Sequence, residues 1–120
     1  MWDVITTERF DVWFYLQPEL LQDEILAAFR ILGEFGPNLG RPYVDTVKGS
    51  KYVNMKELRI QFSGNPVRAF FAFDPRRQAI VLCAGDKTGV NEKRFYKDMI
   101  KIADAEFSLH LRNKELTWQP

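Results

Sequence analysis

The chain has 120 residues, of which 17 are basic and 16 acidic, so its net charge is only +1. This length suits one domain, residues 1–120, and the balanced charge excludes a general attraction to nucleic acids or membranes, so a polyanion must be bound by a local cluster of cations. Cys83 is the only cysteine, which excludes an internal disulfide, and with no Cys/His metal pattern, no secretory start and no membrane-length apolar run we expect a cytoplasmic protein without metal or cofactor.

The first third of the chain predicts a short strand followed by two helices. Residues 2–6 alternate like a strand and are expected at the edge of the sheet. Thr6 or Thr7 caps the first helix, and Pro18 suits the first turn of a second helix that ends near Gly33. Apolar residues recur at helical spacing in both helices, namely Phe10, Trp13, Phe14, Leu21, Ile25, Ala28, Phe29 and Leu32. We therefore expect a helical hairpin that covers one face of the sheet.

The strongest regularity lies in residues 56–87 and predicts three antiparallel strands joined by two turns. A loop over residues 36–42, a short strand over Tyr43–Val47 and a turn at residues 48–51 lead into this region. Leu58, Ile60 and Phe62 alternate with polar residues, as in a strand with one buried face. Residues 67–73 form a second strand, and residues 79–84 are continuously apolar, which indicates a strand covered on both sides.

The two turns predict a register for these strands. Pairing Phe62 with Val67 puts Gln61 opposite Arg68, and pairing Phe73 with Ala79 puts Arg68 opposite Ala84. Arg59, Arg68 and Lys87 are then expected to converge at one end of the sheet, on a face that is short of carboxylates. Clustered cations of this kind suit a phosphate-bearing partner. The alternative is that the arginines are solvated or paired with a neighbour such as Glu57.

The last helix is predicted from an N-cap at Asn91 to about Leu111. Its apolar stripe consists of Tyr96, Met99, Ile100, Ala103 and Phe107. Lys93, Arg94 and Lys97 occupy the opening turns, where the helix dipole disfavours positive charge, so this placement favours a functional interpretation. The Tyr96 hydroxyl is close enough to the start of the helix to reach the polar end of the sheet. His110, near the last turn, is interpreted as structural.

Three segments carry a resemblance to a known family. They are GRPYVDTVKGSKYVNMKELR, VRAFFAFDPRRQAIVLCAGDKTG and RFYKDMIKIADAEFSLHL, and together they cover most of the chain. In this combination the chain resembles the phage Gp49-like branch of the RelE/ParE toxin superfamily, whose members include HigB-type toxins. The resemblance implies a RelE/ParE-like α+β fold, in which an N-terminal strand and a helical hairpin pack on an antiparallel sheet that is followed by a C-terminal helix.

The resemblance also implies a function and partners. It implies the toxin of a type II toxin–antitoxin system, a metal-independent endoribonuclease that cleaves mRNA on the ribosome and so inhibits translation and growth. The partners would be the ribosome, mRNA and a cognate antitoxin, which would be a HigA-like helix-turn-helix protein. The toxin would contact DNA only through this antitoxin. Carried over by position, the catalytic residues would be Arg59, Arg68, Lys87, Lys93 and Tyr96, and the further RNA-binding residues Lys51, Tyr52, Lys56 and Arg94.

Two positions depart from the pattern of the family, and two other functions stay open. Tyr52 stands where many relatives have a histidine, and Glu57 where RelE-type members place a lysine, so the general base is not identified. One alternative function is a ParE-like toxin that inhibits gyrase, which the set of Arg68, Lys87 and Tyr96 disfavours. The other is a non-catalytic, phage-derived interaction domain in which the cations only pair with acidic neighbours.

Overall fold

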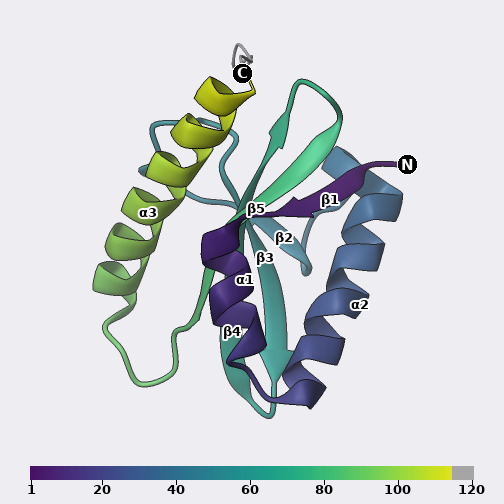
Figure 1. Cartoon of the computed structure of the whole chain (residues 1–120). Helices are drawn as coiled ribbons and strands as arrows, with labels where there is room; N and C mark the ends of the chain where they lie inside the picture. The colour runs from purple at the N-terminus through teal and green to yellow at the C-terminus, as the bar shows by residue number, and fades with distance from the viewer. Residues whose placement is uncertain (115–120) are drawn as a thin grey trace.

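The computed structural model describes residues 1–114 and shows a sheet with helices on both faces (Figure 1). In chain order the elements are β1 (Asp3–Thr6), α1 (Glu8–Tyr15), α2 (Glu19–Phe35), the 3-10 turn η1 (Gly36–Asn38), β2 (Val44–Thr46), β3 (Lys56–Phe62), β4 (Asn65–Asp74), β5 (Gln78–Asp86) and α3 (Glu92–Asn113). The predicted α+β class is confirmed, and so are the strand–hairpin–sheet–helix order and the N-caps at Thr7 and Asn91.

The sheet has five strands in the order β1-β5-β4-β3-β2. Strands β2 to β5 run antiparallel to their neighbours, as predicted, whereas β1 pairs with β5 in parallel. The sheet is therefore mixed, and the direction of β1 was not predicted. No hairpin joins β1 to β5, so turn geometry places no constraint on the direction in which β1 enters the sheet. Its position at the edge of the sheet agrees with the prediction.

The turn between β3 and β4 is tighter than predicted, which changes the register. It has two residues, Ser63 and Gly64, with φ angles of 50° and 78°, as in the primed turns that match the twist of a hairpin. Phe62 therefore pairs with Asn65, and the predicted pairing of Phe62 with Val67 was wrong. As a consequence Arg68 lies directly opposite Arg59, and not opposite Gln61.

The second hairpin confirms one predicted pairing and corrects another. Phe73 pairs with Ala79, as predicted. The register shifts between Phe70 and Phe71, so Arg68 faces Gly85 and not Ala84. A bulge of this kind adds a residue to one strand and bends it locally. Both corrections bring the cationic side chains closer together, because Arg59, Arg68 and the end of β5 now lie in one row across the sheet.

The helices divide the core into two halves. On one face α1 and α2 cover the apolar side of the sheet, in a cluster that includes Phe10, Ile25, Leu58, Ile60 and Phe71. On the other face α3 packs on the sheet in a cluster built around buried side chains of both, namely Phe70, Ile80, Leu82, Ala103 and Phe107. The predicted hairpin cover is confirmed. Arg59 and Arg68 alternate along β3 and β4 with side chains of the cluster under α1 and α2, so they lie on the α3 face.

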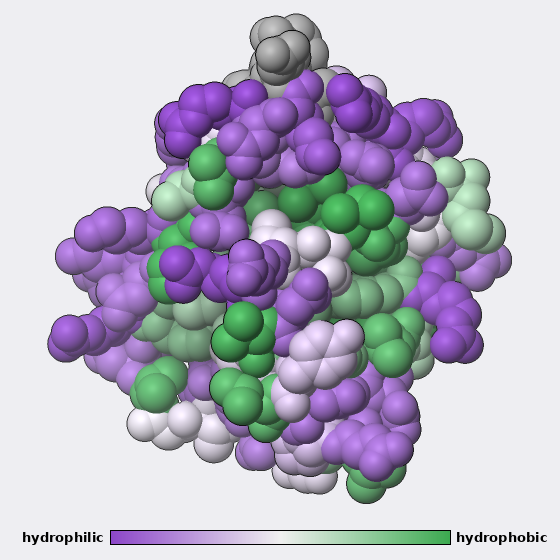
Figure 2. Space-filling model, in the orientation of Figure 1, coloured by the Kyte–Doolittle hydropathy of each residue, from purple (hydrophilic) through white to green (hydrophobic). Residues whose placement is uncertain are grey.

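The face of the molecule seen in Figure 2 exposes several hydrophobic side chains among hydrophilic ones. A hollow of about 1150 Å³ runs between α1 and α3, with Ile5, Val12, Leu16 and Leu109 in its lining. None of the candidate catalytic residues lines this hollow. Within residues 1–114, no helix is both long and apolar enough to span a membrane.

Candidate anion-binding site

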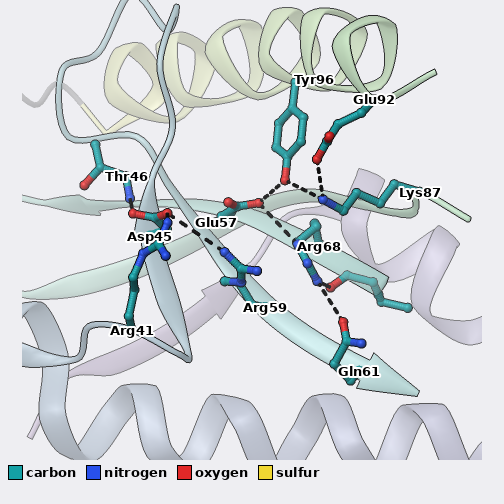
Figure 3. A network of polar contacts seen from close by, with 11 residues as sticks. Arg41, Asp45, Thr46, Glu57, Arg59, Gln61, Arg68, Lys87, Glu92 and Tyr96 are labelled. Atoms are coloured by element: carbon teal, nitrogen blue, oxygen red, sulfur yellow. Dashed lines mark hydrogen bonds and ion pairs between the residues drawn. The ribbon is translucent and has the colours of Figure 1, made fainter. Parts of the chain in front are cut away.

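Four cationic side chains meet in a cleft of about 510 Å³ at the end of the sheet near β3, β4 and the exit of β5 (Figure 3). Its lining consists of Arg41, Pro42, Arg59, Gln61, Pro66, Arg68 and Lys87, and contains no carboxylate. We call it the cation cleft. The predicted convergence of Arg59, Arg68 and Lys87 is confirmed. Arg41, which comes from the loop before β2, was not among the predicted site residues.

Arg68 is the buried member of the cation cleft. Its residue exposure is 3%, and its Nε lies 3.5 Å from Oε1 of Glu57, which is itself only 6% exposed. Nη1 donates to the Val67 carbonyl oxygen at 3.0 Å and to Gln61 at 3.4 Å, whereas Nε is buried without a hydrogen-bond partner. The expectation of a face short of carboxylates was therefore wrong, since Glu57 lies beside Arg68 on the same face. The guanidinium is nevertheless only partly satisfied.

Tyr96 links the last helix to this charge pair. Its hydroxyl donates to Glu57 Oε1 at 2.5 Å, and Lys87 Nζ donates to the same hydroxyl oxygen at 3.5 Å. Burial of the phenol, together with the hydrogen bond to Glu57, raises the pKa of Tyr96 to about 12. The phenol is therefore protonated at neutral pH and is not a general base there. The prediction that this hydroxyl reaches the polar end of the sheet is confirmed.

The two outer cations also have acidic neighbours. Lys87 Nζ donates to Glu92 at 2.7 Å, and this bond and charge hold the pKa of the exposed Glu92 below its usual range. Arg59 Nη1 lies 3.9 Å from Asp45, which is bound more closely by Arg41 at 2.6 Å. The hydrogen bond from Arg41 is the main cause that lowers the pKa of Asp45. Neither Arg59 nor Arg68 is thus held by a short ion pair, and both keep donors for an incoming anion.

The remaining predicted residues lie outside the cation cleft. Lys93 and Arg94 are exposed in the first turn of α3, and Arg94 lies 3.9 Å from Asp98. Lys51 donates its backbone N–H to Asp104, and the Lys56 ammonium donates to Thr46. Tyr52 is buried, and its hydroxyl shares a hydrogen bond with Ser108.

Sequence reasoning named Glu57 only as an alternative partner of the arginines, which the contact with Arg68 bears out, and gave Glu92 and Gln61 no role in the site. Periodicity shows on which face of a strand a side chain lies, but it does not show that a charged side chain will be buried. The signal that could have been used for Glu57 is its place two residues before Arg59, on the same strand face. His110, interpreted as structural, pairs with Asp74 at 2.9 Å, far from the cleft lining. In the described part of the chain no group of three His, Cys, Asp or Glu residues could hold a metal ion.

The fold is that of the RelE toxins. A double arginine mutant of the E. coli toxin RelE in the free state superposes with a TM-score of 0.58 over 83% of this chain and 95% of that chain, at 11% identity. The isolated E. coli RelE toxin gives a TM-score of 0.55 over 84% and 97%, also at 11% identity. Identity this low shows the fold alone.

The sequence gives the family. The model of the phage-derived protein Gp49-like family (DUF891) matches residues 12–108, and the chain belongs to this family. It is 46% identical to HigB2 of Mycobacterium tuberculosis over 92% of the chain, which spans only 55% of the length of HigB2. It is also 46% identical to HigB3 of the same organism, over 84% of this chain and 86% of that protein.

Proposed function

We propose that the chain is the toxin of a type II toxin–antitoxin system and that it cleaves mRNA on the ribosome. The observation that carries the proposal is the cation cleft, in which Arg59 and Arg68 stand opposite each other on neighbouring strands beside Lys87. The relatives HigB2 and HigB3, whose names describe them as toxins, support it, and so does the RelE-like fold. The protein would act in the cytoplasm, where ribosomes and mRNA are present.

The reaction that we assign to the cation cleft is a transesterification at phosphorus without a metal ion. The 2′-oxygen of a ribose attacks the adjacent phosphorus while the bond to the 5′-oxygen breaks. The products are a 2′,3′-cyclic phosphate and a free 5′-hydroxyl. The guanidinium groups of Arg59 and Arg68 match two phosphate oxygens and stabilise the charge that builds on them in the transition state. Lys87 adds charge or supplies the proton that the departing oxygen requires.

The remaining catalytic roles are assigned by elimination and position. Tyr96, protonated and bonded to Glu57, holds Lys87 through its hydroxyl oxygen and does not accept the proton of the 2′-hydroxyl. Lys93 and Arg94 lie outside the cleft lining, in the exposed first turn of α3, where they suit contacts to the RNA backbone. Lys51 and Lys56 suit the same role on the approach to β3.

The partners follow from the same proposal. The ribosome supplies most of the affinity for mRNA, because a net charge of +1 gives the free chain little attraction for RNA. A cognate antitoxin of the HigA-like helix-turn-helix type would hold the toxin inactive, and contact with DNA would occur only through that antitoxin. A small gene beside this one that encodes such a protein is the first observation to seek.

The test compares two arginines of equal charge and different position. Arg59→Gln removes a cation from the cleft, whereas Arg30→Gln removes an exposed cation from α2. We expect Arg59→Gln to lower the rate of mRNA cleavage by about 10²–10³-fold, the usual cost of one transition-state donor. Arg30→Gln should cleave like the unmodified chain. Cleavage is mapped by primer extension in a translation extract, and growth after expression gives the second readout.

Two results would overturn the proposal. One is an unmodified chain that leaves mRNA intact in the extract but blocks DNA supercoiling by gyrase. The other is an Arg59→Gln variant that is as active and as toxic as Arg30→Gln. Harmless expression of the unmodified chain without any antitoxin would instead favour a non-catalytic interaction domain.

A further inference from the structure

A second hollow adjoins the cation cleft and differs from it in character. It has a volume of about 320 Å³ and lies between α2 and β3, with Ala27, Ala28, Ile31, Leu39 and Tyr43 in its lining. We call it the apolar cleft. Pro42, Arg59 and Gln61 line both clefts, so the two adjoin at β3, the cation cleft towards the α3 face and the apolar cleft towards α2. An anion held by Arg59 therefore lies across β3 from an apolar space that is large enough for a small planar group.

The apolar cleft exists because one edge of β3 is left open. β2 pairs only with Lys56–Leu58. The backbone N–H of Arg59 still donates to the Tyr43 carbonyl oxygen at 2.7 Å. Backbone groups point to alternate edges along a strand, so the N–H and C=O of Gln61 face the same edge as those of Arg59. In the described part of the chain no strand pairs with β3 there. The cleft thus offers a donor and an acceptor beside an apolar surface.

These features together suit a nucleobase. Tyr43 is 47% exposed and lines the cleft, so its ring is available for stacking. Stacking of a base on an aromatic side chain is favourable for every base, and hydrogen bonds to its edge select among bases. An apolar peptide side chain would use the stacking surface and the apolar walls, but it would leave both the Gln61 backbone groups and the adjoining cations unused.

We propose that the apolar cleft binds the base of a nucleotide whose phosphate lies in the cation cleft, and that it thereby sets the sequence preference of cleavage. The proposal rests on the function proposed above and identifies the part of the substrate that the chain itself reads. Arg59 is the shared element, since it lines both clefts. Tyr43 provides stacking, and the backbone of Gln61 reads the edge of the base.

The first experiment separates the base from the phosphate in the purified chain. Methyl resonances of Ala27, Ala28, Ile31 and Leu39 are followed by NMR during titration with adenosine 3′-monophosphate and, separately, with inorganic phosphate. We expect the nucleotide to shift these methyl signals and phosphate alone to leave them in place. If both probes or neither probe shifts the methyl signals, the proposal is overturned, whatever becomes of the cleavage activity.

The second experiment fills the cleft. Ala27→Trp adds a large side chain at an exposed lining position, and Ala105→Trp adds the same side chain at an exposed position of α3 outside all three hollows described above. We expect Ala27→Trp to lower cleavage of ribosome-bound mRNA about tenfold or more, or to change the bases at the cut, while Ala105→Trp does neither. Tyr43→Ala, which removes the stacking ring, is the second variant and is expected to shift the preference in the same way.

The outcomes separate this proposal from the function on which it rests. Unchanged rate and preference in both Ala27→Trp and Tyr43→Ala would overturn the base site and leave the nuclease proposal intact. Loss of antitoxin binding in Ala27→Trp, with cleavage unchanged, would assign the apolar cleft to the antitoxin and overturn the base site as well. An unmodified chain that does not cut mRNA would overturn the nuclease proposal, and the NMR titration would then decide the base site alone.

Discussion

Tyr96 donates a hydrogen bond to Glu57 at 2.5 Å, which ties the start of α3 to β3. Glu57 also faces the guanidinium of Arg68, so one buried carboxylate holds a phenol and a cation together. The hydroxyl proton of Tyr96 is thus donated to Glu57, and the hydroxyl oxygen of Tyr96 accepts a hydrogen bond from Lys87. The orientation of Arg68 and Lys87 in the cation cleft therefore depends on Glu57 and Tyr96, neither of which lines the cleft.

The ionisation of Tyr96 tests this arrangement. Burial and the bond to Glu57 raise the pKa of Tyr96 from 10.0 to about 12. The difference in ultraviolet absorbance between the unmodified chain and Tyr96→Phe should then show a phenolate that forms near pH 12. Because the raised pKa belongs to the folded state, the stability that it contributes is complete below about pH 10 and is lost between about pH 10 and 12. The free energy of unfolding should thus fall more between about pH 10 and 12 in the unmodified chain than in Tyr96→Phe. A Tyr96 phenol that ionises near pH 10 would contradict this expectation.

The buried pair of Arg68 and Glu57 predicts a rescue by a second substitution. Arg68→Ala leaves the Glu57 carboxylate buried without an opposing charge, which should lower the free energy of unfolding by about 3–5 kcal/mol. Arg68→Ala combined with Glu57→Gln removes both charges and keeps an acceptor for Tyr96, so it should recover most of that loss. Urea denaturation measures the change, and both variants should be inactive as nucleases because both lack Arg68.

The rescue separates structure from catalysis at Arg68. If Arg68→Ala is as stable as the unmodified chain, the pair of Arg68 and Glu57 is not needed for folding. If the double variant is no more stable than Arg68→Ala, the charge of Glu57 is not the cause of the lower free energy of unfolding. If the stable double variant cleaved mRNA normally, Arg68 would have no part in the chemistry.

The convergence of the cations could be predicted because it depends on features that a sequence displays. The alternation around Leu58, Ile60 and Phe62 shows which face of β3 carries Arg59, and two consecutive hairpins bring β4 and the end of β5 beside it. An error in the turn does not remove this convergence. It moves Arg68 along β4 without changing its face, since the predicted pairing was displaced by two residues.

The details that decide the chemistry could not be predicted in this way. Asn65 and Pro66 have the composition of a turn, yet both belong to β4, because Ser63 and Gly64 adopt the positive φ angles that close the hairpin. The burial of Glu57 depends on Arg68 from the next strand and on Tyr96, 39 residues away along the chain. The apolar cleft depends on how far β2 extends along β3, and no local pattern specifies that length.

The chemistry of the cut predicts both the products and an inert substrate. An mRNA that carries a 2′-deoxyribose at the cleaved nucleotide should resist the protein, because the attacking oxygen is absent. An mRNA with the same change three nucleotides away should be cut normally. The fragments of ordinary mRNA should end in a 2′,3′-cyclic phosphate and a 5′-hydroxyl, which ligation and phosphatase treatment distinguish from other ends. A 3′-hydroxyl and a 5′-phosphate would indicate attack by water and would contradict attack by the 2′-oxygen.

Asp74 is expected to stabilise the fold at a distance from the cation cleft. Its Oδ1 accepts from the backbone N–H groups of Arg76 and Gln78 at 2.9 and 3.2 Å, and its Oδ2 contacts His110 at 2.9 Å. Its side chain is fully buried, so Asp74→Ala leaves several polar groups without an acceptor and should lower the free energy of unfolding by about 2–4 kcal/mol. Urea denaturation measures this, with the exposed Asp23→Ala as the control, expected within about 0.5 kcal/mol of the unmodified chain. Equal stability of the two variants would show that the contact with His110 does not anchor the end of α3 to the β4–β5 turn.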